Sequence, residues 1–298
     1  MEWRAASSAE ELRDTGVGGR YATIDHSMIA SQLLSWFNLL PIWRNRQRVW
    51  GSLLEATTFD RYLYLSLHRS GWMGRDDKEF FERIVRPGMH VIDVGANVGL
   101  YAALFSRLVG ESGRVTAIEP DPLLFKALKT NCSLNGLTNV KLYNVAAGAS
   151  SGVGTFSQSL VNSGDGRMGQ VPAGDLRRSM EVRVAPIDEI AAGEPVDFIK
   201  IDVQGWEGEV LKGMHQVLTS NPAVQVCFEY WPSGLRAAGF DPKALLAVVE
   251  KYGFQIWPAS RTGSEPTTKF SELNGPRGKG YTNVYAVREA VRGNPGCG

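Results

Sequence analysis

The chain has 298 residues, enough for one large α/β domain or two smaller ones. Its 32 basic residues nearly balance 31 acidic ones, so the net charge of +1 gives no electrostatic case for nucleic acid as the main partner. Hydrophobic residues make up 43% and charged residues 21% of the chain, as in ordinary globular proteins.

Cysteine usage and the N-terminal segment indicate the compartment. Three cysteines, Cys132, Cys227 and Cys297, form no CxxC pair, which argues against disulfides or structural zinc and favours a reducing cytoplasm. The segment "MEWRAASSAEELRD" has no apolar core and is not expected to be a secretory signal. The apolar stretch 28–43 is shorter than the roughly 20 residues of a membrane span, so we expect a helix packed on the main domain. The basic "RNRQR" after it leaves weak membrane-surface attachment as an alternative that we do not favour.

Predicted strands and helices alternate after a mostly helical and irregular N-terminal part, in which residues 76–85 form a helix closed by Pro87-Gly88. Short β-branched runs predict five strands, which are residues 90–95, 114–120, 140–148, 196–205 and 223–232. Apolar spacings of three and four residues predict four helices, which are residues 100–108, 121–136, 207–218 and 242–254.

The alternation is interrupted between Ser150 and Met180, where the chain is rich in glycine and serine and has little periodicity. Long loops inside a compact domain are commonly functional, so we expect a lid-like insertion near residues 150–180. Residues 254–260 and 281–289 read as two strands with no helix between them, which predicts an antiparallel closing pair.

These elements predict a doubly wound α/β fold, with a mostly parallel sheet of about seven strands and an antiparallel closing strand. We expect a mainly helical N-terminal extension or cap over residues 1–79, the main domain over residues 80–290 and a flexible tail over residues 291–298. In such sheets ligands bind beyond the carboxyl ends of the strands, so site residues should directly follow strand ends.

The stretch "VIDVGANVG" contains a turn between the first strand and its helix. Gly95 and Gly99 let the backbone approach a ligand closely, and the helix start offers unpaired N–H groups. Asp93 precedes the turn and would repel phosphates but suit a cationic ligand, whereas Glu119, after the second strand, is placed to bind a ribose diol. A nucleoside with a positive, phosphate-free tail fits this combination, and S-adenosylmethionine is such a ligand.

Two alternatives remain for this turn. Asp93 could simply cap the following helix, with the glycines only making a tight turn. A nicotinamide-dependent oxidoreductase is disfavoured, because the turn reads G-x-x-x-G and lacks the G-x-G-x-x-G of dinucleotide-binding proteins.

The chain resembles the FkbM-type family of S-adenosylmethionine-dependent methyltransferases. The segments that carry the resemblance are "VIDVGANVGLYAALFSRLVGESGRVTAIEPDP", "LFKALKTNCSLNGLTNVKLYNVAAG" and "VDFIKIDVQGWEGEVLKGMHQVL" with "VQVCFEY" behind it. The resemblance implies a Rossmann-like fold and methyl transfer to oxygen, commonly to a hydroxyl of a sugar or a polyketide-type natural product.

The resemblance also implies roles for particular residues. It assigns a group of residues to the cofactor site, namely Asp93, Gly95, Asn97, Gly99, Glu119, Asn144, Ala146 and Asp202. Asp202 and Glu207 match the family's acidic pair after the fourth strand. Where the family usually reads "DVEG" this chain reads "DVQG", so Gln204 stands in place of a carboxylate and cannot be a general base.

Methyl transfer to an alcohol needs a group that takes up the hydroxyl proton. Asp202 is the leading candidate because it ends the fourth strand, although it could instead cap a helix or bind the cofactor's ammonium group. Lys200 shares its strand face and could pair with Asp202 or with Glu229, which ends the fifth strand. These three residues are the catalytic candidates.

Substrate contacts are expected from Gln204, Trp206, Glu207 and Tyr230 near the cleft, although Glu207 could equally be a helix-dipole partner. Other aromatic residues expected near the cleft are Trp72 and Trp231. His90 and His215 are expected to be structural, whereas His26 and His68 could reach the acceptor from the N-terminal region.

The sequence therefore predicts an S-adenosylmethionine-dependent O-methyltransferase that acts on a small hydroxylated acceptor. Asp202, Glu207 and Glu229 could hold Mg²⁺, but no ligand spacing indicates a metal. A non-catalytic module that binds a cofactor or a protein partner is the alternative. Neither nucleic acid nor a membrane is expected as a partner, and association into a homo-oligomer is left open.

Overall fold

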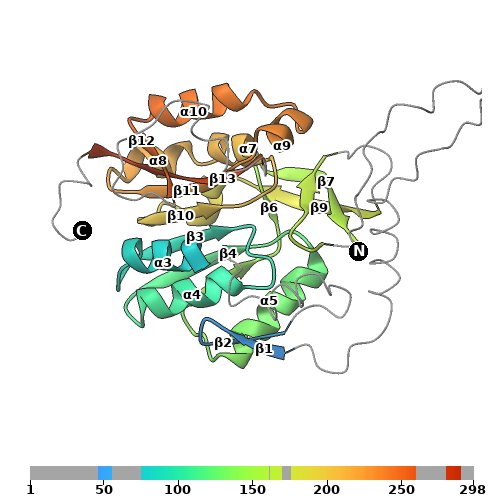
Figure 1. Ribbon diagram of the computed structural model, residues 1–298, viewed down its shortest axis with the longest axis vertical. Helices are drawn as coiled ribbons and strands as arrows, with labels where there is room; N and C mark the ends of the chain where they lie inside the picture. The colour runs from blue at the N-terminus through green and yellow to red at the C-terminus, as the bar shows by residue number, and fades with distance from the viewer. Residues whose placement is uncertain (1–45, 56–74, 161, 170–175, 260–279, 290–298) are drawn as a thin grey trace, which may run out of the picture.

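The computed structural model describes residues 46–55, 75–160, 162–169, 176–259 and 280–289 (Figure 1). Within these residues a central sheet of seven strands has the order β12-β13-β11-β10-β3-β4-β5. Its strands are β3 (His90–Val94), β4 (Arg114–Ile118), β5 (Val140–Tyr143), β10 (Phe198–Ile201), β11 (Gln225–Tyr230), β12 (Gln255–Pro258) and β13 (Thr282–Val287). The predicted sheet is therefore confirmed.

The order of the strands reverses between β3 and β10. From β3 the chain runs outward through β4 to β5, and then it returns to β10 on the other side of β3 and continues to β11. All of these pairs are parallel, whereas β13 is antiparallel to both β11 and β12, as the closing-pair prediction required. The carboxyl ends of β3 and β10 thus form a switch point, where open α/β sheets bind their ligands.

Helices cover both faces of this sheet because buried side chains alternate along each strand. Ile92, Ile199 and Val226 belong to one core cluster, and their neighbours Val91, Phe198 and Cys227 belong to another on the opposite face. The helices are α3 (Arg75–Ile84), α4 (Leu100–Val109), α5 (Pro122–Leu134), α6 (Ile187–Ala191), α7 (Glu207–Lys212), α8 (His215–Ser220), α9 (Pro232–Ala237) and α10 (Pro242–Lys251).

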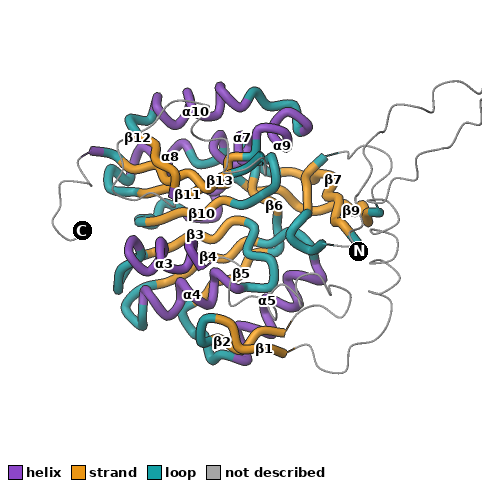
Figure 2. The backbone as a smooth tube through the Cα atoms, in the orientation of Figure 1, coloured by secondary structure: helices purple, strands orange, loops and turns teal. Residues whose placement is uncertain are grey.

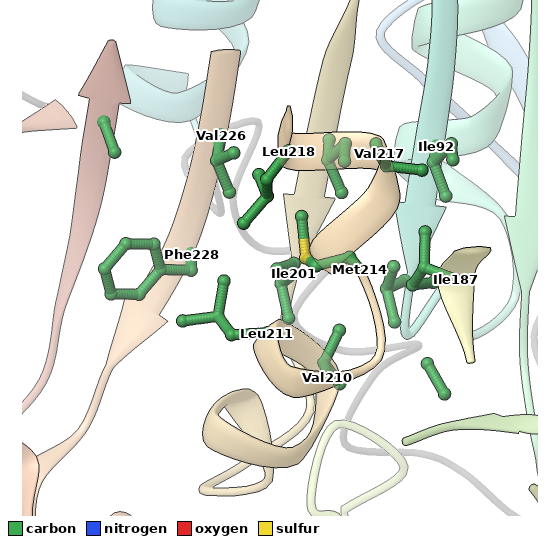
Figure 3. Close-up of a cluster of buried hydrophobic side chains, with 14 of the residues drawn as sticks. Ile92, Ile187, Ile201, Val210, Leu211, Met214, Val217, Leu218, Val226 and Phe228 are labelled. Carbon is green, nitrogen blue, oxygen red and sulfur yellow. The ribbon is translucent and has the colours of Figure 1, made fainter. Parts of the chain in front are cut away.

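The larger core cluster packs α7 and α8 against the sheet. Figure 3 shows Leu211, Met214 and Leu218 directed toward Ile201 and Val226. Each of these side chains is almost fully buried, and burying one leucine- or valine-sized side chain contributes roughly 1.5–3 kcal/mol. This packing fixes the carboxyl end of β10.

The helix predicted over residues 207–218 is divided into α7 and α8 at Gly213. A Cβ atom at Gly213 would overlap the carbonyl oxygen of Gly148, so this point of the chain lies directly against the loop after β6. The Asp188 carboxylate then accepts hydrogen bonds from the N–H groups of Gln216 (2.9 Å) and Val217 (2.8 Å), which start α8. These contacts come from residues remote in sequence, and the apolar spacing of the segment gave no sign of them.

The expected loop between Ser150 and Met180 is largely β structure in its described part. β7 (Gly152–Ser159) pairs antiparallel with β8 (Gly166–Met168) and with β9 (Arg177–Ala185), and β6 (Ala146–Ala147) pairs parallel with β9. Figure 2 shows this second sheet beside the central one. Phe156 and Val182 are buried with Ala146, so cross-strand packing overrides the weak local pattern.

Two parts of the N-terminal extension are also described, and whereas residues 75–79 belong to α3, residues 46–55 are not helical. β1 (Arg46–Val49) and β2 (Ser52–Glu55) form a hairpin beside α5 (Figure 1). The side-chain oxygens of Asn131 and Asn135 accept hydrogen bonds from the N–H groups of Glu55 and Leu53 at 2.7 and 2.8 Å. The predicted helix over residues 28–43 and the tail over residues 291–298 lie outside the described residues. Within the described ranges, no helix has the length and apolar character needed to cross a membrane.

Replacing Gly213 with alanine should destabilise the protein, because the added methyl group would overlap the Gly148 carbonyl and reach Pro186 Cα at 3.2 Å. We expect the free energy of unfolding to fall by about 1–3 kcal/mol in a urea titration. Gly152→Ala is the matched control, since a Cβ there has no atom within 4 Å, and its effect should stay within about 0.5 kcal/mol. Equal midpoints for the two variants would contradict this account of Gly213.

Candidate functional site

A cavity of about 620 Å³ opens at the carboxyl ends of the parallel strands. It is lined by residues that directly follow β3, β4, β10 and β11, with further walls from α3, the second sheet and β13. Its volume falls in the range of ordinary small-molecule pockets. The cavity therefore lies where the sheet topology predicts a ligand.

The turn after β3 forms the floor of this cavity. Gly95 and Gly99 have φ angles of +81° and +93°, which favour glycine, and Asn97 between them has a φ of +51°. A Cβ atom at Gly95 would overlap the backbone carbonyl of Asp202, so only glycine lets this turn lie against the end of β10. Gly99 occupies the N-cap position of α4 without a side-chain cap.

Glu119, at the end of β4, ties this turn to the next strand. Its two carboxylate oxygens accept hydrogen bonds from the N–H groups of Asn97 (2.8 Å) and Asp121 (2.9 Å). The residue is only 3% exposed but lines the cavity, and burial raises the pKa of its carboxyl group to about 8. Remaining lone pairs on the carboxylate can accept hydrogen bonds from hydroxyl groups of a ligand.

The two residues assigned to the adenine side occupy different positions. Ala146 lines the cavity. Asn144 is exposed, and its side-chain amide donates to the carbonyl groups of Glu119 (2.8 Å) and Pro120 (3.0 Å). Asn144 therefore supports the turn after β4 rather than forming part of the cavity wall.

Asp93, which we expect to suit a cationic ligand, is not among the residues that line the cavity. Its carboxylate is fully buried in β3, and neither oxygen makes a hydrogen bond of ordinary geometry with a described residue. The Nζ atom of Lys200 lies 3.7 Å from its Oδ1 atom. Burial raises the pKa of Asp93 to about 6, although the charge of Lys200 opposes this rise. Lys200 is its charged neighbour, and Asp93 serves as the counter-charge to that lysine.

Asp202, Lys200, Gln204 and Glu229 meet at the ends of β10 and β11, and all four line the cavity. Lys200 Nζ lies 3.4 Å from Asp202 Oδ2 and 4.4 Å from the centre of the Tyr101 ring. The side-chain amide nitrogen of Gln204 donates to Asp202 Oδ1 (3.0 Å) and to Glu229 Oε2 (2.9 Å). The amide thus bridges the two carboxyl groups.

Burial controls the protonation of the groups in this cluster. Burial raises the pKa of Glu229 well above its ordinary value, and the neighbouring charge of Asp202 adds to the rise. For Lys200, burial favours the neutral form, but Asp202 and Asp93 outweigh it and the pKa of the ammonium is raised. The surroundings therefore favour the charged form of Lys200 and the protonated form of Glu229.

Of the remaining residues predicted to contact substrate, one lines the cavity and two do not. Trp206 is part of the cavity wall. Glu207 is fully buried, and its Oε1 atom accepts from the N–H groups of Val203 and Gly205 instead. Tyr230 points into the hydrophobic core because alternate residues of β11 face opposite ways, and the following Trp231 lines the cavity.

Among the cavity residues that were not predicted from the sequence, three are joined to one another by hydrogen bonds. Asp77 of α3 accepts hydrogen bonds from the Tyr101 hydroxyl group and the Asn283 amide group, both at 2.9 Å, and all three line the cavity. Asp77 precedes the buried Phe80 and Phe81 by three and four residues, so it shares their helix face. In the sequence, an acidic residue on the apolar face of a predicted helix could have indicated that Asp77 has a role in the site.

The two described histidines are structural, as expected. His90 hydrogen-bonds Pro195 O (2.8 Å) and Thr116 Oγ1 (3.0 Å) at the far end of the sheet. His215 begins α8, rather than lying within one long helix, and bonds the Tyr252 hydroxyl at 2.7 Å. His26, His68 and Trp72 lie outside the described residues. In the part of the chain that is described, no group of three or more His, Cys, Asp or Glu residues is arranged to hold a metal ion.

Comparison with known proteins gives a consistent result. A family model described as "Methyltransferase FkbM domain" matches residues 93–256, which is more than half of the chain. Methyltransferase sdnD of Sordaria araneosa is 28% identical over 203 residues, covering 56% of this chain and 73% of that protein. Hexuronic acid methyltransferase AglP of Haloferax volcanii is 32% identical over 154 residues, covering 51% of this chain and 57% of that protein. A crystallised SAM-dependent methyltransferase from Aquifex aeolicus is 20% identical, with a TM-score of 0.41 and coverage of 71% and 88%.

Glu207 gives this site a measurable pH dependence. Burial raises the pKa of its carboxyl group from 4.5 to about 7, and its buried Oε2 atom has no hydrogen-bond partner among the described residues. The folded protein therefore binds this proton more tightly than the unfolded chain, and stability is lost as the pH rises from about 4.5 to about 7.

Glu207→Gln should remove this loss. We compare the free energy of unfolding of the variant with that of the unaltered protein at each pH, by urea unfolding. The difference should favour the variant by about 1–3 kcal/mol more at pH 8 than at pH 5. Glu209→Gln on the same helix is the control, because Glu209 forms an ion pair with Lys212 at the protein surface. A constant difference between Glu207→Gln and the unaltered protein at both pH values would refute the prediction.

Proposed function

Because this chain belongs to the FkbM methyltransferase family, we propose that it transfers a methyl group from S-adenosylmethionine to a hydroxyl oxygen of a small acceptor. The observation that carries the proposal is the convergence of Glu119, the Gly95–Gly99 turn and the Asp202–Glu229 pair on one cavity. The cavity thus contains both the residues proposed to bind the methyl donor and those proposed to bind the acceptor.

The residues present fit the donor. Glu119 lines the cavity with acceptor capacity left for a ribose diol, and Gly95 lets the turn after β3 lie against the end of β10, where a Cβ atom would overlap the Asp202 carbonyl. Asn97, Ala146 and Asp202 complete this part of the wall. When bound, S-adenosylmethionine supplies a methyl group that its sulfonium already activates toward attack by oxygen.

The sheet order separates the two ends of the cavity. Glu119 follows β4 and Asp202 follows β10, two strand spacings away, which corresponds to about 10 Å. A nucleoside held by Glu119 is therefore distinct from an acceptor held near β10 and β11. The main work of the protein is to hold the acceptor oxygen in line with the methyl group.

Asp202 is the proposed general base. Lys200 contacts its Oδ2 atom and Gln204 its Oδ1 atom, so the carboxylate is held in one orientation at the cavity wall. Asp202 accepts the hydroxyl proton of the acceptor as the new oxygen–carbon bond forms. Gln204, which replaces the family's usual glutamate, takes no proton but donates to both carboxyl groups.

Glu229 has a different proposed role. Because burial raises its pKa well above the ordinary value, Glu229 favours its protonated form, and in that form it is a hydrogen-bond donor and not a base. The protonated carboxyl group can donate a hydrogen bond to an oxygen of the acceptor and so orient it. Trp206 and Trp231 supply aromatic surface for the body of the acceptor.

We propose a sugar or a polyketide-type compound as the acceptor. The name of the AglP relative, a hexuronic acid methyltransferase, supports a sugar-derived acceptor for this chain. The near-balanced charge of the chain supports a small molecule rather than a nucleic acid. Two buried free thiols, Cys132 and Cys227, suit a reducing compartment such as the cytoplasm.

Donor binding provides the first test. Calorimetry should show that the protein binds S-adenosylmethionine and does not bind NAD. Glu119→Gln should weaken donor affinity about 2- to 10-fold, since the amide group keeps only one of the two oxygens that can accept a hydrogen bond from the ribose, and one such bond is worth roughly 0.5–1.5 kcal/mol. Glu111→Gln, an exposed substitution after α4, is the control and should leave affinity unchanged. If the unaltered protein takes up no S-adenosylmethionine, the proposed function fails.

Methyl transfer provides the second test, and it separates an enzyme from a non-catalytic binding module. We expect transfer of a labelled methyl group to a member of a panel of hydroxylated sugars and polyketide-type alcohols. Asp202→Asn should slow transfer roughly 100-fold or more, while donor affinity stays within severalfold because the backbone carbonyl that packs on Gly95 is retained. An unchanged rate would remove Asp202 from the role of base.

A further inference from the structure

A guanidinium group stacked on an indole ring forms the cavity wall beyond β11. The Cζ atom of Arg167, in β8, lies 4.7 Å from the centre of the Trp231 ring, and both residues line the cavity. Trp231 is fixed in turn by Gly234, where a Cβ atom would overlap the indole. Arg167 has no part in the proposed transfer of the methyl group.

Arg167 is held rigidly but keeps one edge available. Its Nε and Nη2 atoms donate to the two carboxylate oxygens of Asp165, at 2.6 and 3.2 Å. Asp165 also binds Arg177, whose side chain is only 5% exposed, so two guanidinium groups share this carboxylate. The Nη1 atom of Arg167 has no hydrogen bond to any described residue, and the side chain is 22% exposed. An anchored guanidinium with a free N–H edge is suited to bind a planar anion.

From this geometry we propose that Arg167 forms an anion subsite that binds a carboxylate group of the methyl acceptor. The inference rests on the proposed function, since it names the chemical class of the acceptor at the same cavity. The acceptor is then a hydroxy acid, such as a sugar acid, rather than a neutral sugar.

The stacking of Arg167 on Trp231 assigns the subsite to the acceptor end of the cavity. Trp231 follows β11, three strand spacings from the end of β4, which is about 14 Å from the end of the cavity where Glu119 lies. The charge of Asp165 contributes to the raised pKa of Glu229, so the hairpin lies within electrostatic reach of the cluster that contacts the acceptor hydroxyl.

The charges of the cavity also orient such an acceptor. Acidic side chains surround the reacting end, where Asp77, Asp202 and Glu229 line the wall. A carboxylate placed there would meet like charges or a buried acid, whereas at Arg167 it gains a charge-assisted hydrogen bond. The carboxylate therefore lies at the hairpin and the hydroxyl group turns toward Asp202.

The test is calorimetric titration of the full chain, saturated with S-adenosylhomocysteine, using D-glucuronate and D-galacturonate as probes against D-glucose and D-galactose. We expect at least one acid to bind at least tenfold more tightly than its neutral partner. Arg167→Gln should reduce the preference for the acid to within twofold. Arg167→Lys keeps the positive charge but lacks the planar set of N–H donors, so it should keep part of the preference. Arg183→Gln, an exposed arginine on β9 outside the cavity wall, is the matched control and should keep the full preference.

The subsite and the proposed function fail in different ways. Sugar acids that bind no more tightly than neutral sugars, or a preference that survives in Arg167→Gln, would overturn the subsite. Absence of S-adenosylhomocysteine binding would overturn the proposed function, while the sugar titrations can still be made on the protein without it. Thermal unfolding of each variant separates a lost preference from a lost fold, and Arg167→Lys supplies the comparison if the glutamine variant does not fold.

Discussion

One buried ammonium group makes the acidic end of the cavity possible. Lys200 is 6% exposed and lies between Asp93 and Asp202, with the Tyr101 ring beneath it. Without this cation, a carboxylate buried in β3 and another at the end of β10 would repel each other in a medium of low dielectric constant. Tyr101 extends the arrangement to Asp77, so α3 and α4 are positioned by the same centre.

This centre also explains why the acid nearest the glycine turn is not the one that faces the ligand. Side chains of a strand alternate between its faces, so Asp93 points away from the cavity floor and toward Lys200. The charge of Asp93 acts through Lys200 on Asp202. The acidic residues that line the cavity are others, namely Asp77, Glu119, Asp165, Asp202 and Glu229.

The sequence predicted the parts of the site that depend on strand order alone. Glu119 and Asp202 directly follow parallel strands, Glu229 is the second-last residue of β11, and strand ends of a parallel sheet meet at one edge. Contacts between distant segments could not be predicted in this way. The break at Gly213 depends on Gly148, and the second sheet depends on cross-strand packing of Phe156 with Val182. The position of Tyr230 could be predicted only with the register of β11 known, because a shift of one residue moves a side chain from the core to the cavity.

The place of β13 has a consequence for biosynthesis. This strand is inserted between β11 and β12, and its Asn283 holds Asp77, which comes from the first helix of the described fold. A ribosome delivers β13 after all other strands of the sheet, so a nascent chain lacks both the strand partner of β11 and the support of Asp77 until translation has passed residue 287. The wall of the cavity at Asp77 thus depends on a contact between segments about two hundred residues apart, which closes only once the last strand of the sheet has been made.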